Sequence, residues 1–407
     1  MQPDRERLHQ EFERLRDNSA RRTKDRGFEL AARWNRDETA IEYLYRQGQL
    51  ICDERDLDTV LEAFDQLRLD RPEVTEGPVG LAVLHVPDTD AAEIAAKLAE
   101  VLGDERLVAP NHVLDAQVHV AMCPATEPVP AYGPIPVLGE PVGPGRPRVA
   151  VVDTGYFPEA GIDSGFSRFS AVKKYEIDDD VYVPGTDEIR PYGGHGTATT
   201  ARLLAVSGAE GVEVEVRDCL LGGAVDELAI VEDLEKVIKG GANVVSVQAG
   251  LYARPGNTPK SFDLLYRRVV SKHPDTVIVA AAGNHGTDVP FWPAAYSWVT
   301  AIGALTTGGD YRAPWSNFGY WVDAYTPGES TVIPYPNGRY DYIDETSARF
   351  SNGHAIWSGT SFAAPVVAGL IARRMIEREV SAPVARHLVL QEAAIGALHH
   401  TGPRLIV

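Results

Sequence analysis

The sequence predicts an α/β protein in which a mostly parallel central sheet, with helices on both faces, is preceded by a small α/β sandwich domain. Two observations lead to this prediction. Between residues 148 and 304, apolar runs of strand length alternate with segments of helical periodicity, which is the pattern of repeated βαβ units. Between residues 40 and 120 a shorter strand–helix alternation occurs, and a Pro-rich segment separates the two regions.

Composition is that of a soluble globular protein with enough length for two domains: 407 residues, 44% hydrophobic and 24% charged. The net charge of −19 argues against nucleic acid and anionic membranes as partners. No apolar run is long enough to span a membrane, and the N-terminus lacks the apolar core of a secretory signal, so we expect a cytoplasmic protein. Cys52, Cys123 and Cys219 are too few and too widely spaced for a disulfide framework or a zinc site, and we expect no metal or cofactor.

The N-terminal region predicts an arm followed by a sandwich. Residues 1–39 are highly charged, with Leu8, Phe12 and Leu15 on one side of a short amphipathic helix, and we expect a solvated arm. Residues 40–120 predict strands within 42–52, 79–86 and 106–114, helices over 56–67 and 90–102, and a short extra strand at 71–76. Residues 121–147 are rich in Pro and Gly and predict an extended linker.

Residues 148–407 predict the second domain. Its expected strands cover 148–153, 212–221, 243–250, 276–282 and 298–304, with helices over 226–239 and 262–272. A further helix should follow Ser361, where a Gly-Thr-Ser turn runs into an apolar segment. Continuous apolar strands of this kind are typical of a buried parallel sheet, whose carboxyl ends carry functional groups.

Four polar residues stand in places where a serine nucleophile and its partners would be needed. Asp153 ends a strand, His195 lies in a glycine-flanked turn, Asn284 follows another strand, and Ser361 begins a helix. Taken singly, each has a structural alternative: a turn residue, a surface histidine, a turn former or a helix cap. Together they supply a nucleophile, a base, an orienting carboxylate and an oxyanion donor, in the chain order Asp, His, Ser that is known from subtilisin.

The local motifs then make the resemblance specific. Over residues 148–378 the chain resembles the subtilisin-like serine protease family, on these stretches: Val151-Val152-Asp153-Thr154-Gly155, His195-Gly196-Thr197, Ala281-Ala282-Gly283-Asn284 and Gly359-Thr360-Ser361-Phe362-Ala363-Ala364-Pro365. The resemblance implies a subtilisin-like fold and a serine endopeptidase that acts on proteins or peptides in extended conformation. It implies a catalytic triad of Asp153, His195 and Ser361, with Asn284 in the oxyanion hole.

The resemblance also implies the substrate-binding residues. Gln248, Ala249 and Gly250 would pair with the substrate backbone, and Ala281, Ala282 and Gly283 would form the opposite wall of the pocket for the residue before the cleaved bond. Phe291 would close that pocket and favour small side chains there; the alternative is that Phe291 turns into the core.

Residues 40–120 resemble a propeptide, which implies an inhibitory, fold-assisting domain, with the linker as the site of self-cleavage. Because proline makes many linker bonds poor substrates, one alternative is that residues 40–120 stay attached permanently. Another is that they form a plain accessory domain. An intracellular processing or regulatory protease is the expected role. The alternatives are a silent pseudo-protease that binds peptides and a scaffold that recruits a partner.

Departures from the family pattern are few. Ala198-Thr199-Thr200-Ala201 stands where His-Val-Ala-Gly is usual, so this helix is expected to pack differently, and Gln248 replaces a small serine. Asp178-Asp179-Asp180 lacks a recognisable calcium-ligand spacing, and we interpret it as a solvated acidic loop.

Overall fold

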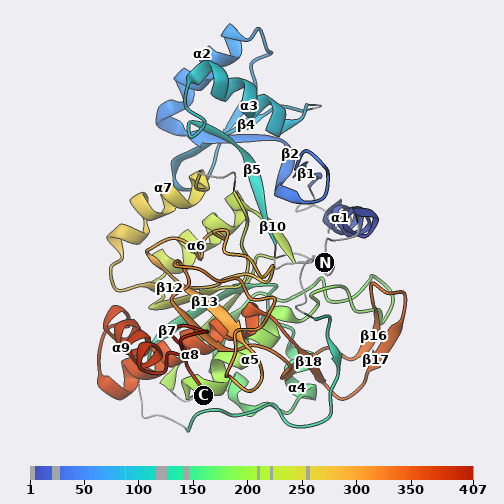
Figure 1. The fold of residues 1–407 in the computed structure, drawn as a ribbon, viewed down its shortest axis with the longest axis vertical. Helices are drawn as coiled ribbons and strands as arrows, with labels where there is room; N and C mark the ends of the chain where they lie inside the picture. The colour runs from blue at the N-terminus through green and yellow to red at the C-terminus, as the bar shows by residue number, and fades with distance from the viewer. Residues whose placement is uncertain are drawn as a thin grey trace. The chain divides into compact units, whose positions relative to one another are not determined.

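The computed structural model describes residues 5–20, 28–87, 89–115, 126–140, 146–208, 211–220, 223–253 and 257–406. The chain divides into two compact units (Figure 1). Unit 1 consists of residues 1–114, 224–236 and 251–273, and unit 2 of residues 115–223, 237–250 and 274–407. This division differs from the domains predicted from the sequence, because two segments beyond residue 148 belong to the N-terminal unit.

Unit 1 is built on a sheet in which β1 to β5 pair antiparallel. Within its described residues the strand order is β10-β5-β2-β4-β3, and β1 pairs with β2. The strands are β1 (Leu30–Trp34), β2 (Ile41–Asp53), β3 (Glu73–Glu76), β4 (Leu81–His85), β5 (Val108–Asp115) and β10 (Ala224–Asp226). Helices α2 (Leu57–Gln66) and α3 (Ala91–Leu102) cover one face and α7 (Lys260–Arg268) lies on the other (Figure 1). The predicted strands and helices of residues 40–115 thus agree with the structure to within a few residues.

The N-terminal arm differs from the prediction. Helix α1 (Arg5–Ala20) exists, but Leu8, Phe12 and Leu15 are buried. Trp34 of β1 explains the burial, because its ring lies 5.6 Å from that of Phe12 and stacks on His9 at 4.3 Å. Strand β1 extends the sheet beside β2, so the described part of the arm is packed into unit 1 rather than solvated.

Unit 2 contains the predicted parallel sheet. Among the described residues its order is β14-β13-β12-β11-β7-β9-β8, and every neighbouring pair is parallel. The strands are β7 (Arg148–Asp153), β8 (Val172–Tyr175), β9 (Glu213–Asp218), β11 (Val244–Val247), β12 (Val277–Ala281), β13 (Val299–Leu305) and β14 (Ala324–Pro327). The predicted α/β class and mostly parallel sheet are confirmed.

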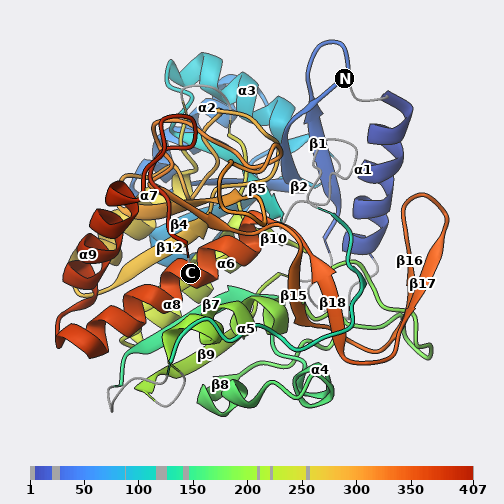
Figure 2. The ribbon, with the colours of Figure 1, turned by 60° about the horizontal axis from the view of Figure 1, so that its bottom comes forward.

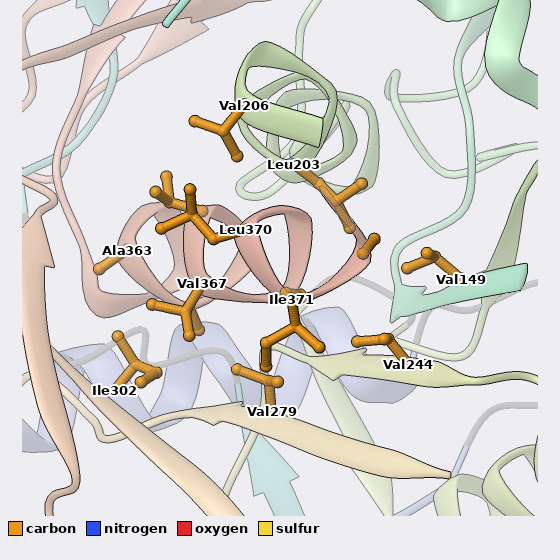
Figure 3. Close-up of a cluster of buried hydrophobic side chains, with 14 of the residues drawn as sticks. Val149, Leu203, Val206, Val244, Val279, Ile302, Ala363, Val367, Leu370 and Ile371 are labelled. Atoms are coloured by element: carbon orange, nitrogen blue, oxygen red, sulfur yellow. The ribbon is translucent and has the colours of Figure 1, made fainter. Parts of the chain in front are cut away.

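The core of unit 2 lies between this sheet and helices α5 (His195–Ser207) and α8 (Thr360–Arg378), which run side by side (Figure 2). In Figure 3, Val367 and Ile371 of α8 point towards Val279 and Ile302 of the sheet, while Leu203 and Val206 of α5 pack on the other side of α8. Helix α8 is buried from Thr360 to Ala372, because small and apolar residues fill all of its faces. Helix α9 (Ala382–Ile395) packs beside α8, α4 (Pro158–Asp163) follows β7, and α6 (Glu227–Lys239) follows β10.

Smaller sheets complete unit 2. Strand β18 (His354–Trp357) pairs antiparallel with β15 (Thr331–Pro334) and with β6 (Val129–Pro130), and β16 (Gly338–Asp341) pairs with β17 (Ser347–Phe350). Short 3-10 turns occur at Glu54–Asp56, Pro78–Gly80, Ser167–Ala171 and Val270–Lys272. The described part of the predicted linker is therefore built into unit 2 as β6, because its backbone finds hydrogen-bond partners there.

Candidate active site

Asp153 is the last residue of the central strand β7, and its carboxylate is fully buried. Its Oδ1 accepts a hydrogen bond from the Thr154 backbone N–H at 2.7 Å and lies 2.7 Å from His195 Nδ1. Its Oδ2 accepts a bond from the Thr199 hydroxyl at 2.9 Å. An ionised carboxylate only accepts hydrogen bonds, so Nδ1 of His195 carries the shared proton and Nε2 is left as the basic nitrogen.

His195 begins helix α5 in a setting that only glycine neighbours permit. Gly194 has φ +78°, and a Cβ on Gly196 would lie 2.2 Å from the Gly155 carbonyl oxygen. The imidazole is 2% exposed and is surrounded by the rings of Tyr192, Trp357 and Phe362, with centroids 5.3 to 5.6 Å away. These rings cover the imidazole and restrict its orientation.

Asp178 supports this arrangement from a different loop. Its Oδ2 accepts hydrogen bonds from the Thr154 hydroxyl at 3.1 Å and from the Gly194 backbone N–H at 2.8 Å. The Thr154 hydroxyl in turn accepts the Gly196 N–H at 2.9 Å, so both backbone amides that flank His195 are held. Burial, reinforced by the charge of Asp218, raises the pKa of Asp178 well above its usual range, although the Gly194 bond opposes this.

The acidic run that contains Asp178 was predicted to be a solvated loop, and for Asp178 this is wrong. Its side chain is only 4% exposed, and the neighbouring Asp180 forms an ion pair with Arg190. Nothing in the local sequence distinguishes Asp178 from its two acidic neighbours. The partners that select it lie 16 and 24 residues away along the chain, so local patterns could not find it.

Ser361 is the second residue of α8 and is 4% exposed. Asn284, after β12, accepts hydrogen bonds at Oδ1 from the backbone N–H and the hydroxyl of Thr360, both at 2.8 Å. This turns the Asn284 amide so that its Nδ2 faces Gly359: a Cβ built on Gly359 would be 3.7 Å from both Asn284 Nδ2 and the Ser361 backbone nitrogen. Asn284 Nδ2 and the Ser361 backbone nitrogen thus both lie beside Gly359, where two N–H donors of an oxyanion hole are expected.

Arg202 fixes the start of α8 from helix α5. It is 5% exposed and donates from Nε to the Phe362 carbonyl and from Nη2 to the Pro327 carbonyl, both at 3.2 Å. Burial lowers the pKa of Arg202 to about 10. Arg202 is thus a buried cation whose guanidinium holds the carbonyl of the residue after Ser361, and local sequence patterns did not single it out.

A match to a protein-family model decides which family the chain belongs to. The model of the subtilase family, Peptidase_S8, matches residues 145–401, which is more than half of the chain. The chain belongs to the subtilase family. The predicted subtilisin-like relationship is confirmed, and with it membership of a family of serine endopeptidases.

Relatives of this subtilase include a thermophilic serine proteinase of Bacillus sp. (strain AK1), 27% identical over 55% of this chain and 51% of the relative. An intracellular serine protease of Paenibacillus polymyxa is 27% identical over 63% of this chain and 74% of the relative. The chain therefore spans about half the length of the former. Among solved structures, fervidolysin from Fervidobacterium pennivorans has a TM-score of 0.56 at 17% identity, covering 89% of this chain and 60% of that one. The epidermin leader peptide processing protease from Staphylococcus aureus has a TM-score of 0.52 at 16% identity, covering 84% and 91%. Both structures show likeness of fold.

The residues expected to bind substrate lie at the carboxyl ends of β11 and β12. Val247 pairs with both Val152 and Ala280, so Gln248 follows at the level of Asp153 and Ala281. Ala249, Ala281, Ala282 and Gly283 are buried around this edge. The Gln248 amide donates to Ser246 Oγ at 2.6 Å, while its Oε1 is buried without a hydrogen-bond partner in the described part of the chain.

Phe291 packs directly on Gly250. A Cβ added to Gly250 would lie 2.2 Å from Cε1 of Phe291, and Phe291 is 2% exposed. The ring is therefore buried, and it covers Gly250, one of the residues expected to bind substrate.

The structure also bears on metal ligands, cysteines and membrane-spanning helices. Within the described ranges, no group of three or more His, Cys, Asp or Glu side chains is placed to hold a metal ion. Cys52 and Cys219 are buried free thiols, and burial raises the pKa of Cys52 to about 12; Cys123 lies outside the described residues. None of the described helices has both the length and the apolar character needed to cross a membrane.

Proposed function

We propose that this subtilase is a serine endopeptidase that hydrolyses peptide bonds through Ser361, His195 and Asp153. The observation that carries the proposal is the buried Asp153–His195 pair at 2.7 Å, joined to Ser361 through the packing of Phe362 on the imidazole. His195 Nε2 takes the proton of Ser361 as the hydroxyl attacks, and later gives it to the leaving amine. Asn284 Nδ2 and the Ser361 N–H stabilise the oxyanion, a contribution of about 3 to 4 kcal/mol per donor.

Among the described residues there is no hydrogen bond between Ser361 Oγ and His195 Nε2. In enzymes of this type such a contact is often long without substrate and tightens in the complex. Asp178 and Thr154 hold the backbone amides on either side of His195, so we expect the Ser361 side chain to be the group that moves when substrate binds.

The N-terminal domain is proposed to hold the protease in check as an intramolecular inhibitor. Support comes from the polar contacts inside unit 1. Glu227 is fully buried at the start of α6 and accepts hydrogen bonds from the backbone N–H of His112 at 3.0 Å, from the His112 ring at 2.7 Å, and from the Ser261 hydroxyl. Arg268 of α7 donates to Asp53 at 2.9 Å and to the Val79 carbonyl at 2.6 Å.

These contacts join the N-terminal sheet to two helices that lie within the segment matched by the subtilase family model. Strand β10, from the same segment, extends that sheet beside β5. Separating these elements would break the pairing of β10 with β5 and several buried hydrogen bonds together, so the association is costly to undo. We propose that the domain stays bound until a signal or a cut releases it.

Substrates of this enzyme are proposed to be proteins or peptides in extended conformation, with a small side chain before the cleaved bond because Phe291 fills the space against Gly250. An intracellular processing or regulatory role is favoured by the likeness to the intracellular serine protease of Paenibacillus polymyxa. Cell fractionation with an antibody against this chain tests the cytoplasmic location; recovery outside the cell contradicts it.

Intact mass spectrometry with a serine-directed fluorophosphonate tests the activity. Wild type should gain one probe adduct on Ser361, and Ser361→Ala should gain none. Clipping between residues 115 and 148 in wild type only would support self-processing and release of the N-terminal domain. Absence of labelling both in the intact protein and after limited proteolysis between residues 115 and 148 contradicts the proposed catalytic function.

A further inference from the structure

Arg202 is a buried cation between the two helices that carry His195 and Ser361. It is 5% exposed and lies on α5 about two helical turns after His195, and therefore on the same side of that helix. Phe362, the residue after Ser361, contacts both of them. Its ring centroid is 5.5 Å from that of the imidazole, and its carbonyl accepts a hydrogen bond from Arg202 Nε at 3.2 Å. The proposed mechanism does not yet use this charge.

The guanidinium also holds the turn that packs against the start of α8. Arg202 Nη2 donates to the carbonyl of Pro327, the last residue of β14, at 3.2 Å. Gly328 follows, and its carbonyl accepts the Gly359 N–H at 2.9 Å. A Cβ on Gly328 would lie 2.7 Å from the Gly359 carbonyl oxygen, so the two turns are in close contact. Arg202 therefore ties together the two backbone segments that fix the position of the Ser361 N–H.

The charge of Arg202 has no counter-ion in the part of the chain that the structure describes. Both of its hydrogen-bond acceptors are backbone carbonyls, and burial is the cause that lowers its pKa to about 10. At neutral pH the guanidinium is thus protonated, and a full positive charge lies in the interior of unit 2. A buried charge without a partner destabilises a folded protein. Folding stability therefore does not account for a cation at this position.

We infer that Arg202 stabilises the oxyanion of the proposed reaction, as a positioning residue for the Ser361 N–H and through its uncompensated charge. This inference rests on the proposed function, since the oxyanion forms only when Ser361 attacks a carbonyl. The bonded Phe362 carbonyl is one helix position beyond Ser361, which places the guanidinium roughly 10 Å from the oxyanion.

The size of the effect follows from this distance. At an effective dielectric constant of about 20, a unit positive charge roughly 10 Å away favours the anion about 10- to 20-fold. The carbonyl of a bound substrate is uncharged and gains far less. The charge of Arg202 therefore acts mainly on the transition state, and should raise kcat rather than lower KM.

Two ligands with the same peptide sequence separate this effect from general binding. One is a peptide boronic acid that ends in boroalanine and forms an anionic tetrahedral adduct with a serine hydroxyl, and the other is the neutral peptide carboxamide. Calorimetry measures both dissociation constants with the full-length protein, before and after limited proteolysis between residues 115 and 148. Arg202→Met removes the charge and should raise the ratio of the boronate constant to the carboxamide constant about 10- to 20-fold. Arg202→Lys keeps the charge and should change this ratio less than about 3-fold.

Arg168→Met is the matched control, because Arg168 also holds backbone carbonyls but at the other end of α5. It donates to the carbonyls of Leu204 at 3.0 Å and Ala205 at 2.8 Å. This control should lose stability in urea without changing the ratio. Arg202→Gln is a second neutral variant that keeps an N–H donor. It should behave like Arg202→Met, and it takes the place of that variant if Arg202→Met does not fold.

A p-nitroanilide assay gives an independent measurement in the active enzyme. Arg202→Met should lower kcat about 10- to 20-fold with little change in KM, after correction for the fraction of enzyme that the fluorophosphonate titrates. Arg202→Lys should recover most of this loss. Equal losses of kcat in both variants would show an effect of packing rather than of charge, and would overturn the inference.

The binding outcomes separate the two proposals. If wild type binds the boronic acid no more tightly than the carboxamide, both before and after limited proteolysis, the proposed catalytic function is contradicted and this inference fails with it. If wild type binds the boronic acid tightly and the ratio is unchanged in the neutral variants, the inference alone is overturned. A rise in Arg202→Lys or Arg168→Met equal to that in Arg202→Met also overturns it.

Discussion

Shortening Phe291 to Ala should enlarge the proposed substrate pocket of this subtilase so that it accepts large side chains before the cleaved bond. In the structure the Phe291 ring occupies the space where a Cβ on Gly250 would lie, and it is 2% exposed. Removing the ring vacates roughly the volume that a substrate phenyl group needs. A Phe side chain buried there gains about 1.5 to 3 kcal/mol over Ala.

That gain corresponds to a rise of about 10- to 150-fold in the ratio of kcat/KM for Phe over Ala at this position. Peptide p-nitroanilides that differ only in the residue before the cleaved bond measure the ratio. The free protein should lose about 3 to 5 kcal/mol of unfolding free energy, the usual cost of truncating a buried Phe. Urea denaturation measures that cost and shows whether the variant is folded at the assay temperature.

Phe166→Ala is the matched control. Phe166 is also buried in the core of unit 2, where it packs against Phe169 at 5.2 Å. This control should lose comparable stability without changing the Phe-to-Ala ratio. An unchanged ratio in folded Phe291→Ala, or an equal change in Phe166→Ala, would refute the assignment of Phe291 to the substrate pocket.

Three further changes probe the supporting residues. Asp153→Asn should reduce kcat by about 10⁴ in a p-nitroanilide assay, because the amide favours the wrong tautomer of His195; a loss below tenfold contradicts the triad. Asp178→Asn should keep the bonds from Thr154 and Gly194 but lack the buried charge. Burial raises the pKa of Asp178 in the folded state, so the protonated side chain stabilises the wild type at low pH. This stabilisation is lost as the pH rises through the folded pKa. Urea midpoints measured from acid to neutral pH should therefore fall less in Asp178→Asn, and parallel curves refute this. Glu227→Ala should destabilise unit 1 by about 3 to 5 kcal/mol and speed proteolysis of residues 40–115, since His112 and Ser261 lose their buried acceptor; unchanged protease resistance argues against a tightly held inhibitor.

The sequence located most of the parallel sheet because its strands are continuous apolar runs. Strands β7, β11, β12 and β13 fall within a few residues of the predicted ranges, since only a strand buried on both faces requires that composition. Helix α8 was predicted for a similar reason: its small and apolar residues suit a helix buried on all sides.

Residues whose role depends on distant partners escaped prediction. Asp178 and Arg202 look like ordinary polar residues in the sequence, and only the packed loops show that one holds the amides beside His195 and the other holds the carbonyl beside Ser361. The arm and the linker were expected to be solvated or extended. Their described parts are packed because Trp34 and β18 offer surfaces that local sequence does not reveal.

The sequence by itself determined the α/β class, the order of strands and helices, and the candidate triad with Asn284, because those depend on local periodicity and on short motifs that need particular neighbours. The tertiary structure alone decided that Asp178 holds the backbone amides beside His195, that Phe291 covers Gly250, and that residues 126–131 pair with β18. Each of these is a contact between segments far apart along the chain, and its energy arises only when folding removes water and brings the partners within hydrogen-bonding or van der Waals distance.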